Sequence, residues 1–108
     1  MAKWTLSYYN AKVAAQIDRW PDGVLASFMS ITRQMLEYGP NIGMPHTRAM
    51  GDGLFEVRAK GREGIGRAFY CTTVGERIVI LHAIIKKTNA TPTRDLAIAR
   101  ARQKEVNA

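Results

Sequence analysis

Basic side chains stand at alternating positions of three apolar, strand-like segments, and their chemistry is that of binding phosphate. Arg58 and Glu56 are two residues apart and therefore share one face of an extended segment. Arg67 lies among apolar residues of the next segment, where a charge needs a partner or a ligand. Lys86 and Lys87 directly follow the third segment. Guanidinium groups contact two phosphate oxygens at once, so this pattern indicates a surface for a phosphate-bearing ligand.

Four further side chains of this region are candidates for contacting a substrate. Lys60 adds a cation to the segment of Arg58, and Glu56 either orients the bound phosphate or a neighbouring base, or forms a surface ion pair with an arginine. Phe55, Phe69 and Tyr70 are mostly core candidates, with display for stacking on a base as the alternative; Tyr70 fits that alternative best because its neighbours in the strand alternation are small. His82 stands in a run of Ile, Leu and Val, where a hydrogen-bonded structural residue is the commoner case and a substrate contact the alternative.

The sequence offers little for metal, cofactor or thiol chemistry. His46 and His82 are far apart and lack a matching cluster of cysteines or carboxylates, which makes a poor zinc site. The single cysteine, Cys71, excludes an internal disulfide and has no activating neighbour in the sequence. The glycines between positions 61 and 66 belong to a hairpin turn rather than a phosphate-cradling loop. We therefore expect neither a metal nor a cofactor.

The positive charge of the chain is unevenly distributed. The 108 residues carry a net charge of +7; residues 1–45 hold four basic and three acidic groups, and residues 46–108 hold twelve and six. A basic half of this kind indicates nucleic acid, an acidic protein or an anionic membrane surface as partner, with a solubilising role as the alternative. No apolar run approaches the roughly 20 residues that span a bilayer, and no export signal is visible. We expect a cytoplasmic protein without membrane contact.

The predicted elements would place these residues on one sheet. We expect a strand over 4–9, a helix capped by Asn10, a second helix from Pro21 to Tyr38, and a last helix with Thr91 as cap and Pro92 at its first position. Between them, strands are expected over 47–50, 54–58, 65–72 and 77–85, the last as the central strand. This order predicts a single α+β domain over residues 1–108, with the helices on one face of a mainly antiparallel sheet. The other face would be partly open for the basic residues.

Several short motifs resemble a known family. GLFEVR, GIGRAFY, the strand ending in LHAIIKKT, and TPTRDLAIARAR follow one another over roughly residues 45–102, and they resemble the HigB-type, phage-derived branch of the RelE/ParE toxin superfamily. In that family an aromatic residue of the pattern YRVFY stands where this chain has Gly66, which predicts that stacking by this position is lost. The resemblance implies a RelE-like fold: an N-terminal strand and helical hairpin packed on the sheet, with a C-terminal helix.

The resemblance also implies an activity and partners. It implies the toxin of a type II toxin–antitoxin system: an endoribonuclease that cuts translated mRNA on the ribosome by metal-free attack of a 2′-hydroxyl. The family's basic positions fall on Arg58, Arg67, Lys86 and Lys87. In this hypothesis both arginines hold the scissile phosphate, and one lysine assists proton transfer or binds ribosomal RNA. The implied partners are the ribosome, mRNA and a cognate antitoxin with a helix-turn-helix domain.

Two other functions fit the same sequence. One is a ParE-like inhibitor of DNA gyrase, which shares the fold and cuts no RNA. The other is a small phage-derived protein that binds nucleic acid without catalysis. The KKT stretch and the basic strand face favour RNA over gyrase.

Overall fold

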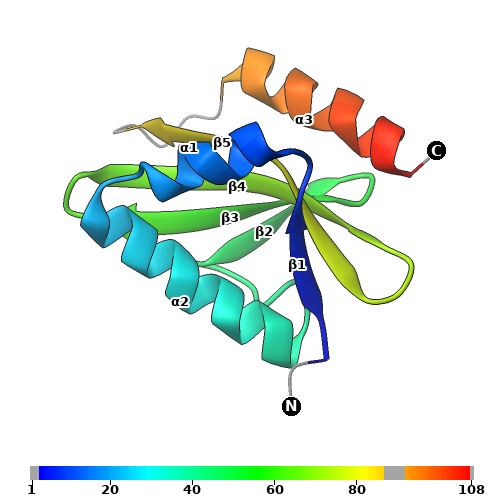
Figure 1. The fold of residues 1–108 in the computed structure, drawn as a ribbon, viewed down its shortest axis with the longest axis horizontal. Helices are drawn as coiled ribbons and strands as arrows, with labels where there is room; N and C mark the ends of the chain where they lie inside the picture. The colour runs from blue at the N-terminus through cyan, green and yellow to red at the C-terminus, as the bar shows by residue number, and fades with distance from the viewer. Residues whose placement is uncertain (1–2, 87–91, 108) are drawn as a thin grey trace.

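A five-stranded sheet lies between helices in the computed structural model, which describes residues 3–86 and 92–107 (Figure 1). The elements are, in chain order, β1 (Thr5–Tyr8), α1 (Ala11–Asp18), α2 (Asp22–Tyr38), β2 (Thr47–Gly51), β3 (Leu54–Gly61), β4 (Gly64–Thr73), β5 (Arg77–Lys86) and α3 (Thr93–Val106). The predicted order of strand, two helices, four strands and helix is confirmed, and so is the α+β class.

The strands follow the order β1-β5-β4-β3-β2. β1 pairs with β5 in parallel, while β2 to β5 form an antiparallel meander. The expectation that residues 77–85 form the central strand is wrong, because β4 is the middle strand and β5 lies between β4 and β1. β5 is nonetheless interior and covered on both faces, which accounts for its apolar sequence.

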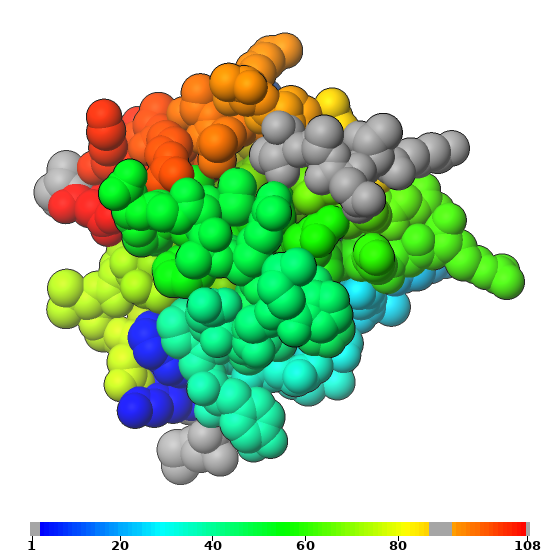
Figure 2. All heavy atoms as spheres, turned by 180° about the vertical axis from the view of Figure 1, so that it is seen from behind, coloured from blue at the N-terminus to red at the C-terminus, as the bar shows by residue number. Residues whose placement is uncertain are grey.

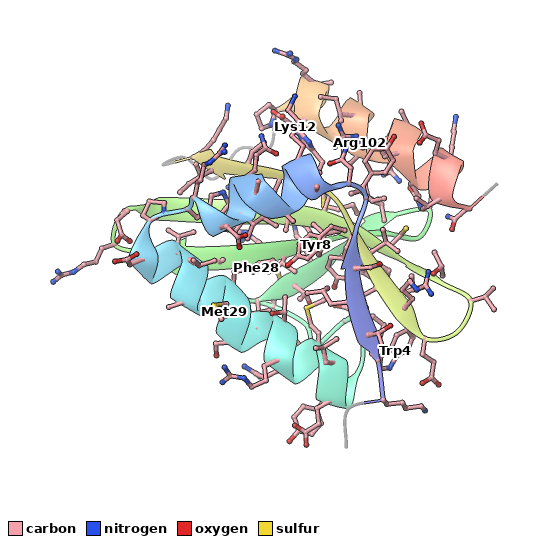
Figure 3. The ribbon with its side chains drawn as sticks, viewed as in Figure 1. Trp4, Tyr8, Lys12, Phe28, Met29 and Arg102 are labelled. Carbon is pink, nitrogen blue, oxygen red and sulfur yellow. The ribbon has the colours of Figure 1, made fainter. Side chains whose placement is uncertain are left out.

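Helices α1 and α2 each bury one apolar side. Asn10 caps α1 as predicted, since its Oδ1 accepts a hydrogen bond of 2.9 Å from the backbone N–H of Val13. α2 has a buried side and an exposed side, as two neighbouring residues labelled in Figure 3 illustrate. The side chain of Phe28 is 2% exposed, and that of Met29 is 53% exposed. This amphipathic pattern is what lets the helical hairpin pack against the sheet.

Two prolines precede helices instead of occupying their first turn. Pro21 and Pro92 are the cap residues of α2 and α3, one position earlier than expected, and neither provides a capping side chain. At α2 a residue from the β3–β4 turn takes part of that role, because the Glu63 carboxylate accepts a hydrogen bond of 3.3 Å from Gly23 N. Thr91, the predicted cap of the last helix, lies outside the described residues.

Each face of the sheet has its own apolar core. On the first, here called the hairpin face, residues of α1 and α2 pack against the sheet residues Val57, Ala59, Ala68, Tyr70, Ile78, Ile80 and Ala83. On the second, here called the α3 face, the core consists of Leu54, Phe69, Cys71, Val79, Leu81 and Ala99. The prediction that helices cover only one face therefore needs a correction: α3 covers part of the second face. The remainder of the α3 face carries the basic residues.

Gly66 belongs to the hairpin face, where it makes room for an aromatic ring. A Cβ atom at this position would come within 2.6 Å of Trp20 Cζ3. The side chain of residue 66 therefore points at the helices, away from the α3 face. The expectation that Gly66 costs the protein a stacking residue is wrong, because this position is buried under Trp20.

Helix α3 is held to the sheet by polar contacts in addition to its apolar core residues. Arg100 donates hydrogen bonds of 2.8 Å to the carbonyls of Met50 and Gly51, and Gln103 donates one of 2.8 Å to the Asp52 carbonyl. α3 and the β2–β3 turn consequently lie side by side on the surface (Figure 2). Part of the basic excess in the second half of the chain is thus structural.

None of the helices within the described ranges combines the length and apolar character that crossing a lipid bilayer requires.

Candidate nucleic-acid interface

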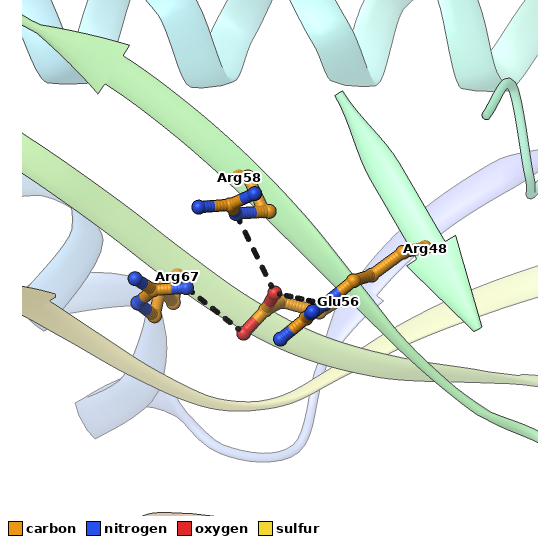
Figure 4. Close-up of polar contacts among 4 residues, drawn as sticks. All are labelled: Arg48, Glu56, Arg58 and Arg67. Carbon is orange, nitrogen blue, oxygen red and sulfur yellow. Dashed lines mark hydrogen bonds and ion pairs between the residues drawn. The ribbon is translucent and has the colours of Figure 1, made fainter. Parts of the chain in front are cut away.

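Three arginines from three neighbouring strands converge on one carboxylate, Glu56 (Figure 4). Arg48 of β2 donates a hydrogen bond of 3.0 Å from Nε to Glu56 Oε1. Arg58 Nε lies 3.8 Å from the same oxygen, and Arg67 Nη1 of β4 lies 3.5 Å from Oε2. We call these four residues the guanidinium cluster. Its three guanidiniums and one carboxylate leave a net charge of +2, which favours an anion.

The members of the guanidinium cluster differ in their access to solvent. The side chains of Arg67 and Glu56 are 0% exposed, that of Arg58 is 14% exposed and that of Arg48 is 38% exposed. The pKa of Arg67 is lowered, chiefly because burial removes water from its charge, while the nearby Glu56 carboxylate opposes this effect. The expected partner of Arg67 is therefore Glu56, and the two form a buried pair rather than a surface ion pair. The direct phosphate contact predicted for Arg67 conflicts with its complete burial.

A bulge in β2 brings Arg48 into the guanidinium cluster. Gly51 pairs with Leu54, so an unbroken antiparallel register would place Arg48 opposite Val57, on the hairpin face. Met50 is an extra residue in β2, and the pairing beyond it shifts so that Arg48 stands opposite Glu56. Such a bulge re-aims the side chains that follow it. The sequence prediction missed Arg48 for this reason, since only the shifted register shows its contact with Glu56.

A second bulge re-aims the end of β5. Tyr70 pairs with Ile80 and Phe69 with His82, so Leu81 is an extra residue. Before the bulge, odd-numbered residues of β5 face α3; after it, His82, Ile84 and Lys86 do. Lys86 is therefore exposed on the α3 face, the same face that carries Arg67, so the two side chains can belong to one site. Lys87, the other predicted lysine, lies outside the described residues.

Helix α3 satisfies the backbone at both bulges. Arg100 Nη2 donates a hydrogen bond of 2.8 Å to the Met50 carbonyl, and Arg102 Nη1 donates one of 2.8 Å to the Leu81 carbonyl. These are the carbonyls of the two extra residues, which a regular ladder would leave without partners. Arg102, labelled in Figure 3, also lies over the ring of Tyr9, 4.5 Å from its centroid. α3 thereby stabilises the two irregularities that aim Arg48 and Lys86.

Beyond the guanidinium cluster, two lysines form an outer row on the α3 face. Lys60, Ile65 and Lys86 are neighbours in register across β3, β4 and β5, next to the row of Arg58 and Arg67. Strands lie about 4.8 Å apart, so the two lysine backbones are separated by roughly 10 Å. Both lysines are exposed, and Ile65 between them is half-buried. The α3 face thus offers cations on either side of an apolar strip, an arrangement that suits a single nucleic-acid strand.

Tyr70 is a core residue, which agrees with the core interpretation and corrects the alternative that it is displayed for stacking on a base. Its side chain is 0% exposed on the hairpin face and stacks on Phe55 with ring centroids 5.4 Å apart. Its hydroxyl donates a hydrogen bond to the Pro40 carbonyl, and burial raises its pKa. Its small neighbours in β4 do not leave it displayed; they make room for the helices that cover it.

His82 links the sheet to α3, which favours the structural interpretation over the substrate contact. Its Nε2 lies 2.8 Å from Asp95 Oδ1 in the first turn of α3, and its ring stacks on Phe69 at 6.3 Å between centroids. Its Nδ1 is buried and has no hydrogen-bond partner among the described residues. Neither ring nitrogen is therefore presented to a ligand.

The remaining candidates for metal or thiol chemistry stay apart. In the described part of the chain, no three His, Cys, Asp or Glu side chains gather into a group that could hold a metal ion. Cys71 is buried, and burial raises the pKa of its thiol, which disfavours the reactive thiolate.

Comparison with known proteins agrees with this fold. A chain of the archaeal RelE–RelB complex from Pyrococcus horikoshii OT3 superposes with a TM-score of 0.56 at 20% identity, covering 82% of this chain and 99% of that one. No protein of curated function matches the sequence. The RelE-like fold is thus confirmed. The model of the family described as phage-derived protein Gp49-like matches residues 15–104, and the chain belongs to that family.

Proposed function

We propose that this protein is the toxin of a type II toxin–antitoxin system and cuts translated mRNA on the ribosome. The observation that carries the proposal is the guanidinium cluster, whose charge of +2 lies on the α3 face beside two exposed lysines. The Gp49-like family and the RelE-like fold support a toxin of this kind. The relative from Pyrococcus was crystallised as a RelE–RelB complex, which supports an antitoxin as partner here. Action on translating ribosomes places the protein in the cytoplasm.

The proposed reaction needs no group beyond the side chains and the RNA. The 2′ oxygen attacks the adjacent phosphorus, the bond to the 5′ oxygen breaks, and the products carry a 2′,3′-cyclic phosphate and a 5′-hydroxyl. Charge accumulates on the phosphate oxygens during this step, and guanidiniums held in place beforehand stabilise that charge. This role falls to Arg58 and Arg48, a proposal supported by their being the two partly exposed arginines of the cluster.

Proton transfer and RNA positioning fall to the outer row. The 2′ proton must leave and the 5′ oxygen must gain a proton. Lys86 lies on this face two residues beyond Ile84, the register partner of Arg67, and assists these transfers. Lys60 binds a neighbouring phosphate. Lys87, outside the described residues, remains the second lysine of this proposal. The ribosome supplies the aligned mRNA, so the site needs little of its own sequence readout.

The test is cleavage of a defined mRNA on purified translating ribosomes, read by primer extension and by the chemistry of the new 5′ ends. We expect cuts inside the reading frame, only when ribosomes translate, with 5′-hydroxyl ends. Arg58→Gln should abolish them, whereas Arg33→Gln, which removes an exposed arginine from α2, should not. Inhibition of gyrase supercoiling without cleavage would establish the ParE-like function instead. RNA binding with neither effect would indicate a non-catalytic binding protein.

A further inference from the structure

The buried pair of Arg67 and Glu56 separates the arginines of the guanidinium cluster into two layers. Arg67 is 0% exposed and faces Oε2 of Glu56, while Arg48 and Arg58 are 38% and 14% exposed and face Oε1. The inner arginine and the outer two therefore meet opposite oxygens of one carboxylate (Figure 4). A ligand approaching from solvent would reach the outer arginines first.

We infer that Arg67 is a positioning residue that acts through Glu56 and does not itself contact the RNA; the inference rests on the proposed function for the identity of the ligand. Arg67 balances the negative charge of Glu56. The positive charges of Arg48 and Arg58 are then not cancelled by Glu56 and remain available to a ligand on the α3 face. Glu56 in turn fixes the two outer guanidiniums in one place before RNA arrives. Arg48 is then a phosphate-contacting residue of the site, although it comes from a strand outside the matched motifs of β3 and β4.

Charge counting shows why Arg67 matters to a ligand that it does not touch. With Arg67 present, the cluster carries +2. If Arg67 becomes Met, the whole Glu56 charge falls on the outer pair and the cluster carries +1. If Glu56 is replaced by Gln, the outer pair carries +2 with or without Arg67, because no carboxylate charge remains for the outer pair to balance. The effect of losing Arg67 should therefore depend on whether Glu56 is charged, which is the signature of a residue that acts through another.

The experiment is a double-mutant cycle on affinity for a short, fluorescently labelled single-stranded RNA at constant low salt. Arg67→Met should weaken binding by about tenfold in the wild-type background, within the range of coupling between contacting residues. In the Glu56→Gln background the same change should weaken binding by less than about threefold. Arg58→Met, as the matched control, should weaken binding in both backgrounds. An equal loss on Arg67→Met in both backgrounds would show direct contact and overturn the inference.

Two further variants keep the test valid if Arg67→Met alone fails to fold. The Glu56→Gln/Arg67→Met protein contains no buried charge in this pair, so it should fold, and it should bind RNA within about threefold of wild type because its outer arginines keep their charge. Arg67→Lys keeps the charge that neutralises Glu56 but loses the planar fork, so it should bind RNA nearly as well as wild type. A loss on Arg67→Lys as large as that on Arg58→Met would contradict the inference. Because affinity is measured without ribosomes, absence of mRNA cleavage in cells would refute the proposed function and leave this result standing.

Discussion

Arg58 is the residue whose replacement should damage the site most with least harm to the fold. Its side chain is 14% exposed and its Nε lies 3.8 Å from Glu56 Oε1, so its guanidinium can meet a phosphate from the solvent side while Glu56 keeps it in place. Arg58→Gln lowers the charge of the guanidinium cluster from +2 to +1. A charged hydrogen bond is worth about 1.5–3 kcal/mol, which corresponds to roughly 10- to 150-fold in RNA affinity. If Arg58 stabilises the transition state, cleavage should fall by about 10²- to 10³-fold.

The assay for Arg58→Gln is RNA affinity as a function of salt, beside Arg33→Gln and wild type. Losing one phosphate contact should reduce the slope of log affinity against log salt by about 0.7 for a single strand. Arg33→Gln removes the same charge from the exposed side of α2 and should leave both quantities close to wild type. Thermal melting should show that both variants fold. If the two variants had equal affinity and equal salt slope, net charge alone would explain binding and the site assignment would be refuted.

Four smaller predictions concern stability and reactivity. Gly66→Ala forces its Cβ to within 2.6 Å of Trp20 and should cost about 1–3 kcal/mol, seen as a lower melting temperature. Asn10→Ala removes the cap of α1 and should cost about 1 kcal/mol in urea unfolding. Burial raises the pKa of Tyr70 above its ordinary value of 10.0, so its contribution to stability is complete below pH 10.0 and is lost as pH rises further; Tyr70→Phe should flatten that alkaline decline. Cys71, whose pKa burial also raises, should react with a thiol reagent far faster in denaturant than in the native protein.

The elements of this fold were predictable because their signals are local. The helices carry apolar residues at helical spacing, and the strands carry β-branched runs bounded by glycine turns. Asn10 is recognisable as a cap from the sequence because capping depends on one side chain and the N–H three residues on. Glu56 and Arg58 were placed on one face by alternation alone, and the structure agrees.

The site itself depends on register, which single residues do not reveal. Arg48 and Lys86 reach the α3 face only because Met50 and Leu81 are extra residues in their strands. The carbonyls of those residues are satisfied by arginines of α3, which lie 50 and 21 positions away along the chain, respectively. Tyr70 was misplaced for a related reason, because small neighbours in a strand can signal either an open surface or a close-packed helix. For Arg48, Lys86 and Tyr70 alike, a contact with an element far away in the sequence decides which way the side chain faces.

The most direct test of the central claim is to map mRNA 5′ ends in bacteria after inducing wild-type protein, Arg58→Gln and Arg33→Gln. The RNA-cleaving function predicts new ends within translated frames for wild type and Arg33→Gln, and none for Arg58→Gln. Growth arrest by the wild-type protein without new ends would contradict it.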